Sequence, residues 1–160
     1  MQVQTSTVIP ASSERIWPLL THSQMTVPGW FCLGIPRPVA CELPNAHGGV
    51  GAQRRCISDR GTVTQSITTW QPPSCLRFRM ESTDHAWAGC VASIHEEFTL
   101  ATTPQGTRVT RVTALSARGP FKTIKEALFY IGLKRVHLYV FRNWRAQSTA
   151  PAPEVAQQPG

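Results

Sequence analysis

The C-terminal part of the chain carries a long helical pattern of apolar residues, between Lys122 and Arg145. This segment contains no proline, and its only glycine is Gly132. Two stripes recur at three- and four-residue steps, which is the spacing of a helix face. The first stripe is Ile124, Leu128, Ile131, Arg135, Leu138 and Arg142, and the second is Phe129, Leu133, Val136, Val140 and Trp144. A helix that is apolar over so much of its circumference is expected to be mostly buried.

Residues earlier in the chain alternate between apolar and polar, which is the period of a β-strand. The pattern predicts seven strands: Val3–Ile9, Val39–Leu43, Val50–Ser58, Thr62–Trp70, Cys75–Glu81, Cys90–Thr102 and Thr107–Leu115. Ser12 or Ser13 caps a short helix that runs to Leu20, and a turn with a second short helix is expected over Thr21–Pro28. Strands at such short spacing indicate an antiparallel sheet. The predicted fold class is therefore α+β, with the helices on one face of a curved sheet.

The length and composition indicate a single domain. Of the 160 residues 41% are hydrophobic, which is enough for a sizeable core. We expect this domain to span residues 1–146. The last residues, 147–160, are rich in proline, alanine and glutamine, and this composition predicts a disordered tail.

The formal net charge of +7 raises the question of a nucleic-acid partner. The lysines and arginines are scattered, and no run of five like charges occurs. Aromatic residues are also not interleaved with the basic ones on any predicted strand, as base-stacking surfaces require. We therefore expect no nucleic-acid partner, and we interpret most of these charges as solvated.

The cysteines and the absence of apolar runs indicate a cytoplasmic protein. Five cysteines form an odd set without metal-ligand spacing, so we expect reduced thiols and no metal. The first residues lack the basic and apolar regions of a signal peptide. No apolar run reaches 18 residues, so no transmembrane segment is expected.

Three stretches of the sequence are similar to a known superfamily. They are TSTVIPASSERIWPLLT at 5–21, GGVGAQRRCISDRGTVTQSITTWQPPSCLRFRM at 48–80 and GTRVTRVTAL at 106–115. They resemble the SRPBCC (START/Bet v 1-like) superfamily, in its polyketide cyclase/dehydrase-like branch, and the resemblance covers residues 3–146. It implies a helix-grip fold, in which the sheet and the long C-terminal helix enclose a cavity.

Strand alternation predicts which side chains face that cavity. If Arg60 and Gly61 are the central residues of a tight hairpin turn, Cys56 pairs with Gln65 and Arg54 with Ile67. The cavity face then carries Val50, Ala52, Arg54, Cys56, Val63, Gln65 and Ile67. In the hairpin of the last two predicted strands, the apolar residues Ile94, Phe98 and Leu100 are expected to face inward. Glu96 alternates with them on the same face, whereas His95 and Glu97 face outward.

The polar residues among these suggest catalytic roles. Arg54 would stabilise an enolate oxygen, Glu96 would act as general base, and His85, beside Asp84 in a loop, is a further acid or base. A structural alternative remains open, in which Arg54 and Glu96 form a buried ion pair or Arg54 reaches solvent. The ligand-binding candidates are Trp30, Cys56, Gln65, Ile67, Phe78, Trp87, Phe98, Ile131, Arg135 and Tyr139.

Two functions follow from the resemblance. The first is an enzyme that cyclises and dehydrates a polyketide-like molecule by aldol chemistry, which needs no cofactor. The second is a non-catalytic carrier of a lipid-like or other apolar ligand. Ionisable groups that converge on the cavity would favour the enzyme, whereas a wholly apolar lining would favour the carrier. The sequence leaves open whether the protein forms a homodimer.

Overall fold

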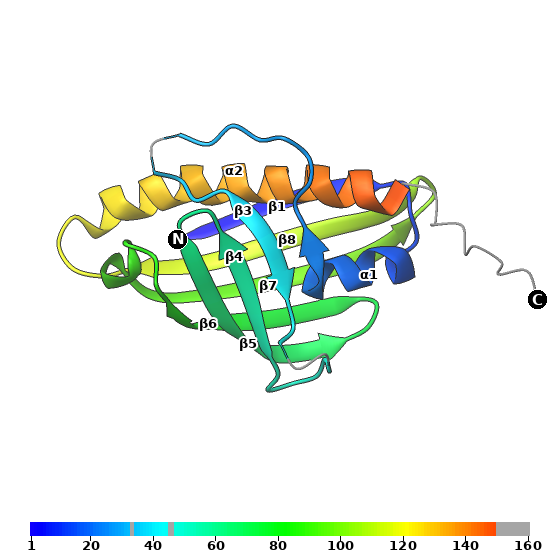
Figure 1. Ribbon diagram of the computed structural model, residues 1–160, viewed down its shortest axis with the longest axis horizontal. Helices are drawn as coiled ribbons and strands as arrows, with labels where there is room; N and C mark the ends of the chain where they lie inside the picture. The colour runs from blue at the N-terminus through cyan, green and yellow to red at the C-terminus, as the bar shows by residue number, and fades with distance from the viewer. Residues whose placement is uncertain (33, 45–46, 150–160) are drawn as a thin grey trace, which may run out of the picture.

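The computed structural model describes residues 1–32, 34–44 and 47–149, which form a curled antiparallel sheet and a long helix that lies across it (Figure 1). The strands are β1 (Gln2–Ile9), β2 (Ser23–Gln24), β3 (Pro38–Glu42), β4 (Gln53–Ser58), β5 (Gly61–Gln71), β6 (Cys75–Thr83), β7 (Val91–Thr103) and β8 (Gly106–Ala117). The helices are α1 (Ser13–Thr21), the 3₁₀ turn η1 (Ala88–Cys90) and α2 (Lys122–Thr149).

The strands form one sheet in the order β1-β8-β7-β6-β5-β4-β3-β2, and every neighbouring pair is antiparallel. The first strand therefore lies beside the last, and α2 packs closest to these two strands. This arrangement confirms the predicted α+β helix-grip fold, because one C-terminal helix covers the concave side of a curved sheet (Figure 1).

One predicted element is different in the structure. Where a second short helix was expected over Thr21–Pro28, the described chain forms the edge strand β2 instead. Ser23 pairs with Cys41 and Gln24 with Ala40. A helix of so few residues is unstable alone, whereas the free edge of β3 offers backbone hydrogen bonds at once. The sheet therefore has eight strands rather than seven.

The β4–β5 hairpin has a different register from the one predicted, but the same faces. Ser58 pairs with Gly61, so Asp59 and Arg60 are the central turn residues and Arg54 lies opposite Gln65. The register differs by two residues, and a shift of two leaves every side chain on its face. The exception is Val50, which precedes β4 and is exposed rather than turned inward.

Helix α2 buries only one of its two apolar stripes. The second stripe supplies core residues such as Val140 and Trp144, which pack with Phe98 and Leu76. The first stripe faces outward, so the prediction of a mostly buried helix was wrong for Ile124, Leu128, Ile131 and Leu138. The helix also continues to Thr149, so Gln147 to Thr149 of the expected tail are helical, and residues 150–160 lie outside the described residues.

No helix in the described residues has the length and hydropathy that a membrane span requires.

Candidate functional site: an apolar cavity beneath helix α2

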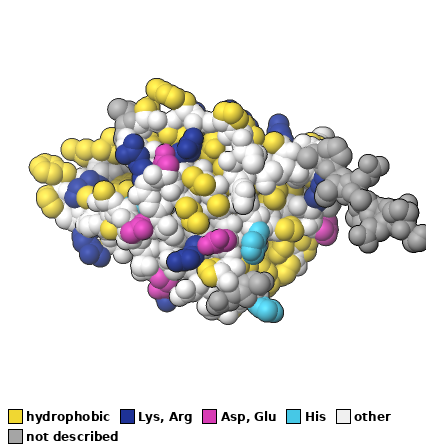
Figure 2. Space-filling model, viewed as in Figure 1, with side chains coloured by type: hydrophobic (Ala, Val, Ile, Leu, Met, Phe, Trp, Pro, Cys, Tyr) yellow, Lys and Arg dark blue, Asp and Glu magenta, His cyan; other side chains and the backbone are white. Residues whose placement is uncertain are grey.

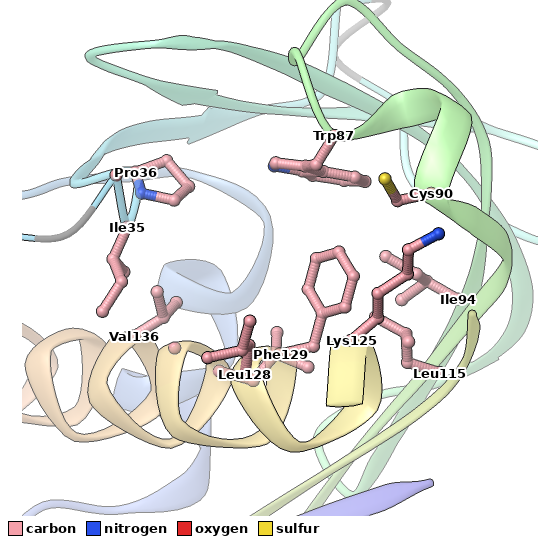
Figure 3. A pocket seen from close by; sticks show the side chains of 13 residues that line it. Ile35, Pro36, Trp87, Cys90, Ile94, Leu115, Lys125, Leu128, Phe129 and Val136 are labelled. Atoms are coloured by element: carbon pink, nitrogen blue, oxygen red, sulfur yellow. The ribbon is translucent and has the colours of Figure 1, made fainter. Parts of the chain in front are cut away.

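An apolar cavity of about 320 Å³ opens between the first half of α2 and the end of the sheet where β7 begins (Figure 3). Trp87 and Cys90 bound it on one side, and Ile35 and Pro36 from the β2–β3 loop bound it on another. Its other lining residues are Gly34, Ile94, Leu115, Lys125, Leu128, Phe129, Gly132, Leu133 and Val136. This volume is at the lower end of the range of small-molecule sites.

The shape of the cavity depends on aromatic packing. The Phe129 ring projects from α2 between Ile35 and Lys125 (Figure 3). It meets the Trp87 ring edge to face, with 5.9 Å between the ring centroids. Two aromatic rings in this arrangement attract each other beyond their contact area, so they hold the η1 segment against the helix.

Among the described residues that line the cavity, only Lys125 has a charged side chain. Its ammonium donates a hydrogen bond to the carbonyl oxygen of Arg118 at 2.9 Å. An ammonium group has three donors, so two N–H groups beyond this bond are available to a ligand. The cavity therefore combines apolar walls with one cationic hydrogen-bond donor.

His85 lies behind the cavity wall rather than in it. Its buried ring stacks on Trp87 with the centroids 5.0 Å apart, and its Nε2 is 3.4 Å from the hydroxyl of Ser58. Burial lowers the pKa of His85, against the opposing charges of Asp84 and Asp59. The ring is consequently neutral near pH 7 and supports Trp87, and it does not face the cavity as an acid or base would.

Arg54 is buried, as predicted, but it has other partners than Glu96. Its Nε donates to the carbonyl of Leu20 at 2.7 Å, and its Nη1 lies 2.6 Å from Gln65 Oε1 and 2.7 Å from Cys56 Sγ. The guanidinium also lies over the Phe78 ring. These contacts tie α1 to the sheet, and Arg54 does not line the cavity.

Two thiols share this cluster, because Cys41 pairs with Cys56 across β3 and β4. The hydrogen bond from the Cys56 thiol lowers the pKa of Cys41 to about 7, and the charge of Arg54 acts in the same direction. The same hydrogen bond, together with burial, raises the pKa of Cys56. Gln65 and Cys56 were predicted to contact the ligand, but their side chains bind Arg54 instead.

Glu96 is buried and forms an ion pair with Arg111, at 2.7 Å between Oε1 and Nη2. The same oxygen accepts a hydrogen bond from Thr113, whose hydroxyl lies 2.9 Å from Nε2 of the buried His137. Thr5 lies 2.8 Å from the other ring nitrogen of His137. The predicted Arg54–Glu96 pair is therefore wrong, and the partner of Glu96 is Arg111.

Alternation along β8 is the sequence signal that marks Arg111. Val109, Arg111, Thr113 and Leu115 alternate on β8, so the apolar ends of this series place Arg111 on the inward face. His137 also had a sequence signal, because it lies four residues after Leu133 and three before Val140, on the stripe that is buried. Its partners come from β1 and β8, which the sequence does not show.

The remaining predicted ligand contacts lie in four places. Trp87 lines the cavity, whereas Ile67, Phe78 and Phe98 are core residues. Trp30, Arg135 and Tyr139 border a second pocket of about 590 Å³ beside α2. There Arg135 donates a hydrogen bond to the Trp30 carbonyl and Tyr139 donates one to the Val27 carbonyl. Ile131 is exposed on the outer side of α2 and does not line the cavity. Of the ten predicted ligand contacts, Trp87 alone is among the described residues that line this cavity.

Among the described residues, no three His, Cys, Asp or Glu side chains lie close enough together to hold a metal ion.

The fold and the cavity define the class of protein: a helix-grip domain whose long helix covers an apolar pocket. Residues 1–137 match the family model described as polyketide cyclase / dehydrase and lipid transport, so the chain belongs to that family. No match was found among curated proteins.

Solved structures of low sequence identity share the fold. One is a START superfamily protein from Mycobacterium smegmatis, with 12% identity, a TM-score of 0.64 and coverage of 92% of this chain and 96% of that chain. Another is major latex-like protein 151 from Panax ginseng, with 14% identity, a TM-score of 0.64 and coverage of 94% and 98%. A third is the Aha1 dimer from Colwellia psychrerythraea, with 14% identity, a TM-score of 0.59 and coverage of 95% and 99%.

Proposed function

We propose that this protein binds a small apolar molecule with one anionic or strongly hydrogen-bond-accepting group in the cavity beneath α2, and carries it without chemical change. The lining of the cavity is the observation that carries this proposal. Apart from Lys125, the lining side chains in the described part of the chain are uncharged. The apolar part of a ligand would contact Phe129, Leu133 and Ile94, while its acceptor group would approach the ammonium of Lys125.

The buried charges support a carrier because they have partners elsewhere. Arg54 is bound by Leu20, Gln65 and Cys56, and Glu96 is paired with Arg111. A general base or an enolate-stabilising cation must reach the reacting atoms, and neither Arg54 nor Glu96 lines the cavity. The five free thiols agree with a cytoplasmic carrier.

Substituting Gly132 by leucine tests the binding site without damaging the fold. A Cβ at Gly132 would meet Ile35 at 3.7 Å, which is ordinary contact, and the rest of a leucine side chain would fill the cavity. Leucine is also more favourable than glycine in a helix interior, by roughly 0.8 kcal/mol. We expect Gly132→Leu to weaken binding of the neutral probe N-phenyl-1-naphthylamine about tenfold or more, while urea unfolding shows equal or higher stability. Probe fluorescence titration measures the affinity.

The matched control is Ala127→Leu, which adds a leucine to the exposed side of the same helix, outside the cavity. It should leave the probe affinity unchanged. Equal affinities of Gly132→Leu and the unsubstituted protein would place the probe elsewhere and contradict the proposal.

A second prediction concerns the charge of Lys125. The probe 1-anilinonaphthalene-8-sulfonate has the same rings as N-phenyl-1-naphthylamine but carries a sulfonate. Lys125→Met removes the cation and keeps a side chain of similar length, so it should weaken binding of the sulfonate about tenfold, as for loss of one charged hydrogen bond. The affinity for the neutral probe should not change. If both affinities changed equally, Lys125 would contribute only packing.

Aldol-type cyclisation and dehydration of a polyketide-like molecule is the second candidate function. One observation favours it: the cross-strand pair Glu96–Thr113 lies two residues from the pair Ile94–Leu115 of the cavity wall, on the same inward face of β7 and β8. Oε2 of Glu96 and Nε of Arg111 are also buried without a hydrogen-bond partner in the described structure. A ligand that reached deeper than the cavity would meet this pair, and Arg111 would take the role predicted for Arg54.

Mass spectrometry of a linear poly-β-ketone mimic, incubated with the protein, distinguishes the two functions. A product that has lost water, formed by the unsubstituted protein but not by Gly132→Leu or Glu96→Gln, would identify an enzyme. If the mimic stays unchanged and Gly132→Leu weakens probe binding, the protein is a carrier.

A further inference from the structure

The outer face of α2 carries an apolar stripe that no other described part of the chain covers. Ile124, Leu128, Ile131 and Leu138 form this outer stripe, and their side chains are 60%, 66%, 62% and 52% exposed. Phe121 before the helix and Trp30 in the neighbouring loop are 74% and 75% exposed. Figure 2 shows hydrophobic side chains protruding at the upper left, where Figure 1 places the first turns of α2. Apolar surface gathered in this way usually marks an interaction site.

The charges around the outer stripe are all positive. Helix α2 has six basic residues, Lys122, Lys125, Lys134, Arg135, Arg142 and Arg145. Its only acidic residue is Glu126, which accepts a hydrogen bond from the backbone N–H of Ala117 and pairs with the N-terminal ammonium and Lys122. Apart from Lys122, the cations of α2 thus have no carboxylate partner on their own helix.

Four of these cations are held by uncharged carbonyl groups. Lys125 donates to Arg118, Arg135 to Trp30, Arg142 to Pro28 and Arg145 to Val8. A carbonyl oxygen satisfies a donor but carries no formal charge. The side chains are therefore held in place while their positive charge stays available to a partner.

These positive charges distinguish between the two partners that such a surface could bind, a second copy of this chain and a membrane. A dimer built on the outer stripe would bring Arg135 and Arg142 of both copies into one apolar seam, because these residues lie within the stripe. Like charges at a shared apolar seam oppose association. A surface of exposed apolar residues flanked by lysine and arginine is instead the pattern of helices that lie in the headgroup region of anionic membranes.

We propose that the outer face of α2, from Phe121 to Leu138 with Trp30 beside it, docks onto the surface of an anionic lipid membrane. The apolar side chains would enter the interface, and the lysines and arginines would contact the lipid phosphates. Leu128 and Lys125 belong to both this face and the cavity wall, so docking would bring the cavity to the membrane surface. The docking proposal depends on exposure and charge, and it stands whether or not the cavity binds a ligand.

Sedimentation with lipid vesicles tests the proposal. We compare vesicles of phosphatidylcholine alone with vesicles that contain about 30% phosphatidylglycerol. The protein should sediment with the anionic vesicles and remain in the supernatant with the neutral ones. Raising sodium chloride from about 0.05 M to about 0.5 M should release most of it, because salt screens the lysine and arginine charges.

Paired variants identify the face that binds. Ile124→Ser with Ile131→Ser should lower the partition coefficient about tenfold or more, because both exposed apolar side chains belong to the outer stripe. The matched control is Val39→Ser with Val50→Ser, which removes two exposed apolar side chains away from α2 and should change nothing. Lys122→Gln with Lys134→Gln should weaken binding, whereas Arg60→Gln with Arg108→Gln, at exposed sites off the helix, should have a smaller effect.

Each outcome has a definite meaning. Equal binding to neutral and anionic vesicles, or equal loss in the outer-stripe variant and its control, would overturn the proposal. A dimer in equilibrium sedimentation that the outer-stripe variant dissociates would assign this face to a second copy. The variant should bind N-phenyl-1-naphthylamine normally, so a failure of docking is separable from a failure of ligand binding.

Discussion

Replacing Arg111 by methionine is expected to lower the free energy of unfolding by about 3–5 kcal/mol. The substitution leaves the Glu96 carboxylate in the interior with the hydroxyl of Thr113 as its remaining donor. The Glu96 and Arg111 side chains are 5% and 10% exposed, so water cannot replace the lost partner. Urea denaturation at pH 7, followed by circular dichroism, measures the effect.

A second ion pair between neighbouring strands provides the control. Arg77 and Glu97 on β6 and β7 lie as close, at 2.9 Å, but on the exposed face. Arg77→Met should therefore change stability by less than about 1 kcal/mol. Adding Glu96→Leu to Arg111→Met should recover much of the loss, because the unpaired charge is then removed. An Arg111→Met variant as stable as the unsubstituted protein would show that Glu96 has another source of stabilisation.

The second large effect is a loss of stability as the pH falls below about 6.5, caused by His137. Burial, reinforced by the charge of Arg111, lowers the pKa of His137 to about 2. The unfolded chain binds a proton near pH 6.5 and the folded chain does not, so stability is complete above pH 6.5 and declines between pH 6.5 and about 2. The slope is about 1.4 kcal/mol per pH unit, which makes about 2 kcal/mol at pH 5.

The hydrogen bonds around His137 explain why the neutral form is favoured. Thr113 donates its proton to Glu96, so its oxygen accepts from Nε2–H of His137. The unprotonated Nδ1 then accepts from the hydroxyl of Thr5. Every polar atom of the neutral ring is satisfied, and a second proton would place an additional charge beside Arg111.

Urea unfolding of the unsubstituted protein and of His137→Gln at pH 7, 6 and 5 tests this prediction. Between pH 7 and pH 5, His137→Gln should lose about 2 kcal/mol less free energy of unfolding than the unsubstituted protein, whatever its stability at pH 7. His95→Gln, at an exposed position on β7, should follow the unsubstituted protein. Parallel curves for His137→Gln and the unsubstituted protein would assign the acid sensitivity to other groups.

The order of strands and the long helix could be predicted from the sequence because both depend on local periodicity. Alternation along Cys75–Glu81 and the steps between Phe129 and Trp144 are properties of consecutive residues. The inward positions of Arg54, Gln65 and Glu96 were predicted for the same reason. These positions were predicted correctly despite the error in the β4–β5 turn, because the predicted register differed from the observed one by an even number of residues.

Partners across the sheet could not be predicted, because they depend on how strands distant in sequence are curved and where the helix lies above them. Alternation places Arg54, Glu96 and Arg111 on one face but does not say that Glu96 meets Arg111 at 2.7 Å while Arg54 bonds to Leu20. The position of the cavity has the same origin, since its walls come from the β2–β3 loop, η1, two strands and α2.

The sequence by itself therefore determined the fold family, the helix-grip architecture and the set of inward-facing polar residues. Only the tertiary structure decided which of the two stripes of α2 is buried, because both have helical spacing and are mostly apolar, although Arg135 and Arg142 fall in the exposed one. That choice leaves Ile124 and Ile131 exposed and turns Phe129 and Leu133 toward the sheet. The apolar cavity and the basic, apolar outer face of the helix both follow from it.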